Sequence, residues 1–160
     1  MTDTRLHALS PLDGRYAEKC ADLAALFSEA ALIRFRVRVE AAWFLQLAAG
    51  NRFAPLAGLP ASVASRLDSL ARGLDEAALA RVKEIERQTN HDVKAVEYYV
   101  REQLAAAGAS PAALEFVHFA CTSEDVNNLS YALMLRDARE RVLLPAIAAV
   151  ADHLAALAAR

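Results

Sequence analysis

Three short polar segments of this sequence carry residue types that could bind an anion or move a proton. In the first, Arg15 and Tyr16 follow a glycine turn at Gly14. From such a turn, the guanidinium fork of an arginine can reach a phosphate or a carboxylate. A salt bridge at the surface would occupy the same arginine. The segment therefore indicates an anion contact only in combination with other polar groups.

The second segment is Asn90, His91 and Asp92, which fall between two stretches of helical periodicity. Amide, imidazole and carboxyl side chains can converge there with free backbone N–H groups. Histidine is a common proton carrier near neutral pH. The alternative is that Asn90 or Asp92 only caps a helix and that His91 is exposed to solvent.

The third segment begins with Thr122 and Ser123, where a long helical pattern starts. A helix start offers unpaired N–H groups and the positive end of the helix dipole, and both favour a bound anion. The two hydroxyl groups would add hydrogen-bond donors. Thr122 with Asp125 also fits the capping-box pattern, so plain capping is the alternative, and the two roles are compatible.

The remaining polar residues are expected to be structural. His118 lies among apolar residues and is expected to be a satisfied core or interface histidine, whereas His153 falls on the polar side of the last helix. A stripe of apolar residues marks the inner face of the helix predicted over 28–49. Four charged residues lie largely off that stripe and are expected to form a solvated face: Arg34, Arg36, Arg38 and Glu40.

These segments belong to a chain that is predicted to be all-α, because no alternating apolar–polar run is long enough for a strand. Helices are expected over 17–27, 28–49, 60–73, 76–89 and 92–107, and a short one begins at Ser110-Pro111. The last helix runs from Thr122 to the end of the sequence, roughly 55 Å at 1.5 Å per residue. Pro145 should kink it. A helix of this length suggests a bundle or an oligomer core.

Composition excludes several classes of protein. The 160 residues are 56% hydrophobic and carry a net charge of −2, which argues against disorder and against a nucleic-acid surface. The N-terminal residues lack an apolar signal-peptide core. The most apolar stretch, 143–159, is shorter than a bilayer span of roughly 20 residues, so no membrane partner is expected. Two cysteines without CxxC spacing argue against a zinc site and for a reduced, cytoplasmic compartment.

Taken together, the three polar segments resemble the N-terminal portion of the adenylosuccinate lyase family, in the fumarase–aspartase superfamily. The matching blocks are residues 10–16, 86–98 and 115–128, and their order and separation also fit. The resemblance implies an N-terminal helical domain over 1–120 and the start of a central helical-bundle domain over 121–160. It also implies a homotetramer that eliminates fumarate from nucleotides bearing a succinyl group, without a metal or organic cofactor.

The resemblance further implies which residues bind substrate. The matching positions are Arg15, Tyr16, Asn90, His91, Asp92, Thr122 and Ser123, and His91 would orient substrate or help to move a proton. The family's general-acid histidine and general-base serine lie in later segments, and neither motif occurs in this sequence. We therefore expect a partial polypeptide that is inactive alone. The alternatives are another lyase of the superfamily, such as argininosuccinate lyase or aspartase, and a helical oligomerisation module without activity.

Overall fold

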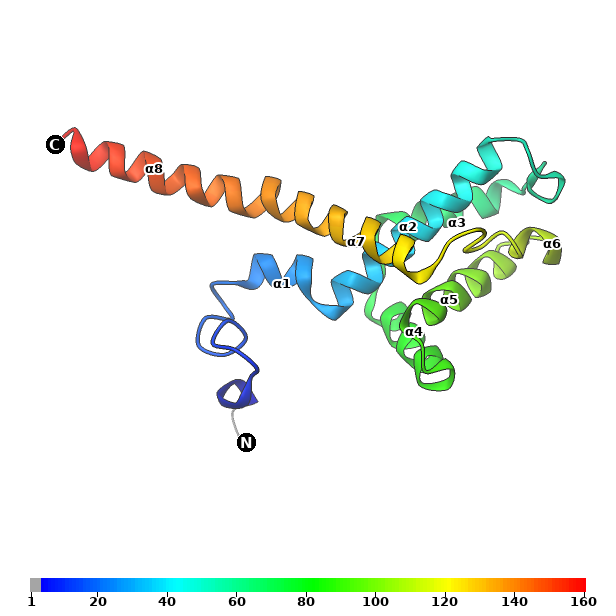
Figure 1. Ribbon diagram of the computed structural model, residues 1–160, viewed down its shortest axis with the longest axis horizontal. Coiled ribbons are helices and arrows are strands. Elements are labelled where there is room, and N and C mark those ends of the chain that lie inside the picture. Colours follow the sequence, from blue (N-terminus) through cyan, green and yellow to red (C-terminus); the bar gives the residue numbers. More distant parts are fainter. Residues whose placement is uncertain (1–3) are drawn as a thin grey trace. The chain divides into compact units, whose positions relative to one another are not determined.

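The computed structural model describes residues 4–160, and within that range every regular element is a helix. The predicted all-α class is confirmed. The elements, shown in Figure 1, are η1 Thr4–His7, α1 Ala21–Phe27, α2 Glu29–Ala49, η2 Ala54–Leu56, α3 Ala61–Arg72, α4 Glu76–Thr89, α5 Asp92–Ala106, α6 Pro111–Leu114, α7 Ser123–Ala138, the π-helical turn η3 Arg139–Leu143 and α8 Leu144–Ala158.

Most helix boundaries follow from local capping. The Ser28 hydroxyl accepts a hydrogen bond from the Ala31 N–H at the start of α2, and Asp75 and Ser110 cap α4 and α6 in the same way. One predicted boundary is wrong. The first helix begins at Ala21 rather than at residue 17, because residues 11–20 form successive turns.

Residues Leu32–Ala132 form one compact unit. Its centre is α5, which packs against α3, α4 and α6, and Figure 1 shows α4 and α5 side by side. Helix α3 buries one face in this unit, since Val63, Leu67 and Leu70 are at most 2% exposed. Burying each such side chain is worth about 1.5–3 kcal/mol. Arg81 of α4 adds a two-pronged ion pair to Glu102 of α5.

Helix α2 departs from the predicted pattern. Of the predicted apolar stripe Phe35 and Val39 are buried, but Ala42 and Trp43 are not, and Val37 and Phe44 outside the stripe are fully buried. Two of the charged residues that were assigned to a solvated face, Arg36 and Glu40, are buried as well. Both have polar partners on other segments of this unit, which compensate the cost of removing their charges from water. The expectation of a solvated face is therefore wrong at these two positions.

The second compact unit comprises residues 4–31 and 133–160. Within it the helix continues through Pro145 and widens to a π-turn just before it, where the Leu144 N–H bonds to the Arg139 carbonyl. Proline has no N–H, and its ring crowds the carbonyl four residues earlier, so a wider turn accommodates it. The predicted domain boundary between residues 120 and 121 stays a prediction.

Helix α8 contains no buried residue within this chain, and large apolar side chains are exposed along it. By length and composition alone, the continuous helix over Ser123–Ala158 could cross a membrane, with a mean hydropathy of 1.5 over its most apolar stretch. This continuous helix is longer than the apolar stretch that was identified from the sequence. The same features suit a helix that packs against other helices.

Candidate functional site

The turn between α4 and α5 presents His91 to solvent. Asn90 ends α4 in a left-handed backbone conformation with φ of 50°. His91 then caps α5, because its Nδ1 accepts a hydrogen bond from the Lys94 N–H at 3.1 Å. With Nδ1 accepting, the neutral ring carries its proton on Nε2. Asn90 is thus the C-cap of α4 and His91 is exposed, as the capping alternative expects. His91 is in addition the N-cap of α5, and its second nitrogen remains available to a ligand.

Asp92 forms an ion pair with the buried Arg36. The two charged groups approach to 2.7 Å, with the Arg36 side chain 6% exposed and that of Asp92 52% exposed. Partial burial acts to raise the pKa of Asp92, but a hydrogen bond from the Val93 N–H and the charge of Arg36 outweigh it and lower the pKa. Asp92 is therefore an anion near neutral pH.

Arg36 also reaches the first turns of α7. Its Nε donates to Oδ1 of Asn127 at 2.9 Å while a terminal nitrogen holds Asp92. Asn127 lies one turn beyond Ser123, on the same side of α7. Arg36 thus links Asp92, in the predicted segment 90–92, to Asn127, one turn beyond the predicted Ser123.

The start of α7 is a capping box, as predicted. The Asp125 carboxylate accepts hydrogen bonds from the Thr122 N–H and hydroxyl, both at 2.7 Å, and these bonds lower the pKa of Asp125. Thr122 is consequently occupied by capping. Among residues 4–160, none is hydrogen-bonded to the Ser123 hydroxyl, which leaves that group for a ligand.

His118 is held just before α7 by Glu40. Its Nδ1 lies 2.5 Å from Oε1 of Glu40, whose side chain is 1% exposed. This bond raises the pKa of His118. His118 and Ala120 both have positive φ, 61° and 59°, a strained conformation for residues other than glycine. Such strain persists only where surrounding contacts enforce it, and it is often found at functional sites. The Trp43 Nε1–H, bonded to the Phe119 carbonyl at 2.8 Å, is a further restraint on this loop.

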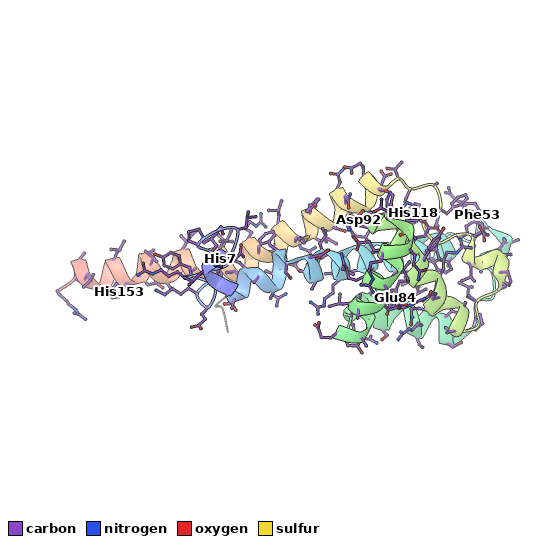
Figure 2. The ribbon with its side chains drawn as sticks, turned by 90° about the horizontal axis from the view of Figure 1, so that it is seen from below. His7, Phe53, Glu84, Asp92, His118 and His153 are labelled. Carbon is purple, nitrogen blue, oxygen red and sulfur yellow. The ribbon has the colours of Figure 1, made fainter. Side chains whose placement is uncertain are left out.

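A further ion pair lies close to His118. Lys94 donates to the buried Glu97 at 2.8 Å, and this bond raises the pKa of Lys94. Both groups act electrostatically on His118. Together, charged and polar groups from α2, α5, the residues leading into α7 and α7 itself form a polar cluster, defined as Arg36, Glu40, Asp92, Lys94, Glu97, His118 and Asn127. Figure 2 labels two members of the cluster, Asp92 and His118.

Five members of this cluster escaped the sequence interpretation: Arg36, Glu40, Lys94, Glu97 and Asn127. A signal was present in α2, where Arg36 and Glu40 are each flanked by apolar residues and lie one helical turn apart. A charge in such surroundings is buried only when it has a partner. His118 was predicted to be a satisfied histidine, and its pairing with Glu40 confirms this.

Arg15 and Tyr16 belong to the other compact unit. They lie in the turns before α1, and the Arg15 guanidinium sits 5.6 Å from the centre of the Tyr16 ring. Both side chains are exposed, so the fork of Arg15 is open to an anion. Their participation in the same site as His91 stays a prediction.

The structure is that of an all-helical protein with a polar cluster at the start of a long helix. Comparison with known proteins identifies its family. Residues 14–160 match the family model described as lyase, and the chain belongs to that family. It is similar to the adenylosuccinate lyases of Vibrio cholerae, at 49% identity over 96% of the chain, and of Escherichia coli, at 49% over 88%. The adenylosuccinate lyase of Haemophilus influenzae is 48% identical. The chain spans about a third of the length of these relatives, their N-terminal portion.

Proposed function

We propose that this chain is the N-terminal part of an adenylosuccinate lyase and supplies part of its substrate site. The reaction breaks a C–N bond by β-elimination: a proton leaves carbon, the nitrogen gains one, and fumarate is released. The substrates would be adenylosuccinate, giving AMP, and the succinyl-carboxamide ribotide, giving the aminoimidazole carboxamide ribotide. The supporting observation is the link that Arg36 makes between the two segments carrying His91 and Ser123.

The chemistry of such a substrate matches the groups present. A nucleotide with a succinyl group carries a phosphate and two carboxylates, which need cationic and N–H donors. The chain offers the exposed fork of Arg15, the free Nε2 of His91, the Ser123 hydroxyl and the start of α7. Tyr16, Asn90, Asp92 and Thr122 complete the proposed binding set. His91 would orient substrate or help to move a proton.

The proposed enzyme assembles from several copies. Helices α7 and α8 would begin the central bundle of a homotetramer, with residues 1–120 as the N-terminal domain, in the cytoplasm. The support is the exposed apolar surface of α8, which includes Ile147, Val150 and Leu154 at 59–64% exposure. Apolar surface of this extent indicates an interaction site. The same surface favours the alternative of a helical association module without activity.

A chimaera tests the proposed function. This chain would replace the matching N-terminal third of the Escherichia coli relative, and fumarate release from adenylosuccinate would be measured. We expect turnover by the chimaera and none by the 160-residue chain alone, because the family's general acid and base, each worth roughly 10²–10⁴-fold, lie in later segments. A folded chimaera without activity would contradict the proposal. A chimaera that instead cleaves argininosuccinate would identify a different lyase of the superfamily.

A further inference from the structure

We propose that Arg36 is a positioning residue that sets the spacing between the start of α5 and the start of α7. The inference rests on the proposed function, in which these two helix starts contribute His91 and Ser123 to one substrate site. Arg36 itself is 6% exposed and lies on a third helix, α2, so it acts through its neighbours rather than on substrate.

The geometry of the guanidinium supports this role. Nε donates to Asn127 at 2.9 Å, and a terminal nitrogen contacts Asp92 at 2.7 Å. The guanidinium is planar and rigid, so the distance between these two donors is fixed by covalent geometry. A shift of α7 relative to α5 would stretch one of the two contacts. The side chain thereby holds the two helix starts at one separation.

Stability alone is a poor explanation for a buried arginine. Removing a guanidinium from water is costly, and well-packed apolar residues often replace a buried ion pair without loss. What apolar residues cannot reproduce is the directional link to two polar groups. Asp92 lies directly after His91, and Asn127 lies one turn after Ser123. Misplacing reacting groups by about 1 Å can cost on the order of 10²-fold in rate.

The decisive variant is Arg36→Lys in the chimaera. Lysine keeps the charge but presents a single point donor, which cannot hold Asp92 and Asn127 in the same fixed geometry. We expect kcat/KM for adenylosuccinate to fall by roughly 10- to 100-fold. Asn127→Ala removes the contact of Arg36 with α7, together with an exposed hydrogen bond from Asn127 to Glu124 on the same helix, and should cause a similar fall. If Arg36 acts through Asn127, the double variant should be no worse than Arg36→Lys.

The matched control is Arg34→Lys, two residues away on α2. Arg34 pairs with the exposed Glu76 and contacts none of the cluster residues among those described. The activity of the Arg34→Lys chimaera should therefore be unchanged. Thermal unfolding is measured for every variant. Unchanged kcat/KM in both Arg36→Lys and Asn127→Ala, with an active parent, would overturn this inference alone. A loss of activity that is fully explained by the loss of folded protein would overturn this inference as well. A folded parent chimaera that releases no fumarate would overturn the proposed function and this inference with it.

Discussion

Nδ1 of His118 lies 2.5 Å from Oε1 of Glu40, and the second carboxylate oxygen of Glu40 is buried without a hydrogen-bond partner among the residues described. A buried carboxylate in this state depends on its one strong contact, because an unpaired buried charge is costly. The pair therefore favours a protonated imidazole. It also links α2 to the strained loop that leads into α7.

The Glu40–His118 pair predicts a pH-dependent stability. The pKa of His118 in the folded chain lies above its ordinary value of 6.5, so the pair stabilises the fold fully below that value. The contribution is lost as the pH rises through the raised pKa. We expect Glu40→Gln to cost about 1.5–3 kcal/mol of unfolding free energy in mildly acidic solution, and less in alkaline solution. Urea unfolding followed by circular dichroism at both pH values measures this difference.

Glu84→Gln is the matched control for that experiment. Glu84 forms an exposed ion pair with Arg81, and pairs of that kind contribute about 0–1 kcal/mol. The assignment of a charged His118 would be contradicted if Glu40→Gln lowered the unfolding free energy equally at both pH values, or by more in alkaline solution.

The substitution His91→Asn tests the role of His91 as a helix cap separately from its role in the reaction. Asparagine is a good N-cap residue, so the start of α5 should keep its stability within about 0.5 kcal/mol. The imidazole is lost, and kcat/KM of the chimaera should fall by roughly 10²-fold or more. A fall in kcat would indicate proton transfer, and a rise in KM would indicate substrate orientation. If kcat and KM are both unchanged, His91 does not belong to the substrate site.

Thr122 and Ser123 should differ in stability when their hydroxyl groups are removed, because only the Thr122 hydroxyl caps α7. Thr122→Ala breaks the capping box and should destabilise the chain by about 1 kcal/mol. Ser123→Ala should leave stability nearly unchanged but weaken binding of substrate, because that hydroxyl is proposed to contact it. Thermal unfolding and KM are measured for both variants. If Ser123→Ala and the parent have equal KM values, the proposed contact of the Ser123 hydroxyl with substrate is wrong.

Arg15→Ala should weaken substrate binding in the chimaera. A hydrogen bond to a charged group is worth about 1.5–3 kcal/mol, which corresponds to a rise in KM of roughly 10- to 100-fold for either substrate. Arg72→Ala is the control, since Arg72 is exposed and pairs only with Asp68 on its own helix among the residues described. Steady-state kinetics that do not distinguish Arg15→Ala from Arg72→Ala would refute the anion contact.

The apolar stripe of α8 predicts self-association. Ile147→Glu with Leu154→Glu places two charges on this stripe, and sedimentation velocity should then show fewer oligomers of the 160-residue chain. Ala156→Glu, on the opposite side of α8, should not change the distribution. Equal effects of the two changes would indicate nonspecific aggregation. Binding to lipid vesicles that Ile147→Glu abolishes would indicate a membrane surface instead.

Helix content and the caps could be predicted from the sequence because they depend on neighbours a few residues apart. Ser28, Asp75, Ser110 and the Thr122–Asp125 box all act within three residues of the sequence, and the Thr122–Asp125 box was found as expected. The three polar segments were recognised for the same reason, because each is contiguous in the chain.

The burial of Arg36 and Glu40 was decided by tertiary structure. Their partners lie 56–91 residues away in the sequence (78 for Glu40 and His118, 91 for Arg36 and Asn127), far beyond the reach of helical periodicity. Periodicity places charges on the solvent side because an unpaired charge is costly to bury. Only the folded unit supplies Asp92, Asn127 and His118 at hydrogen-bonding distance, and these contacts turn an expected solvated face into the centre of the polar cluster.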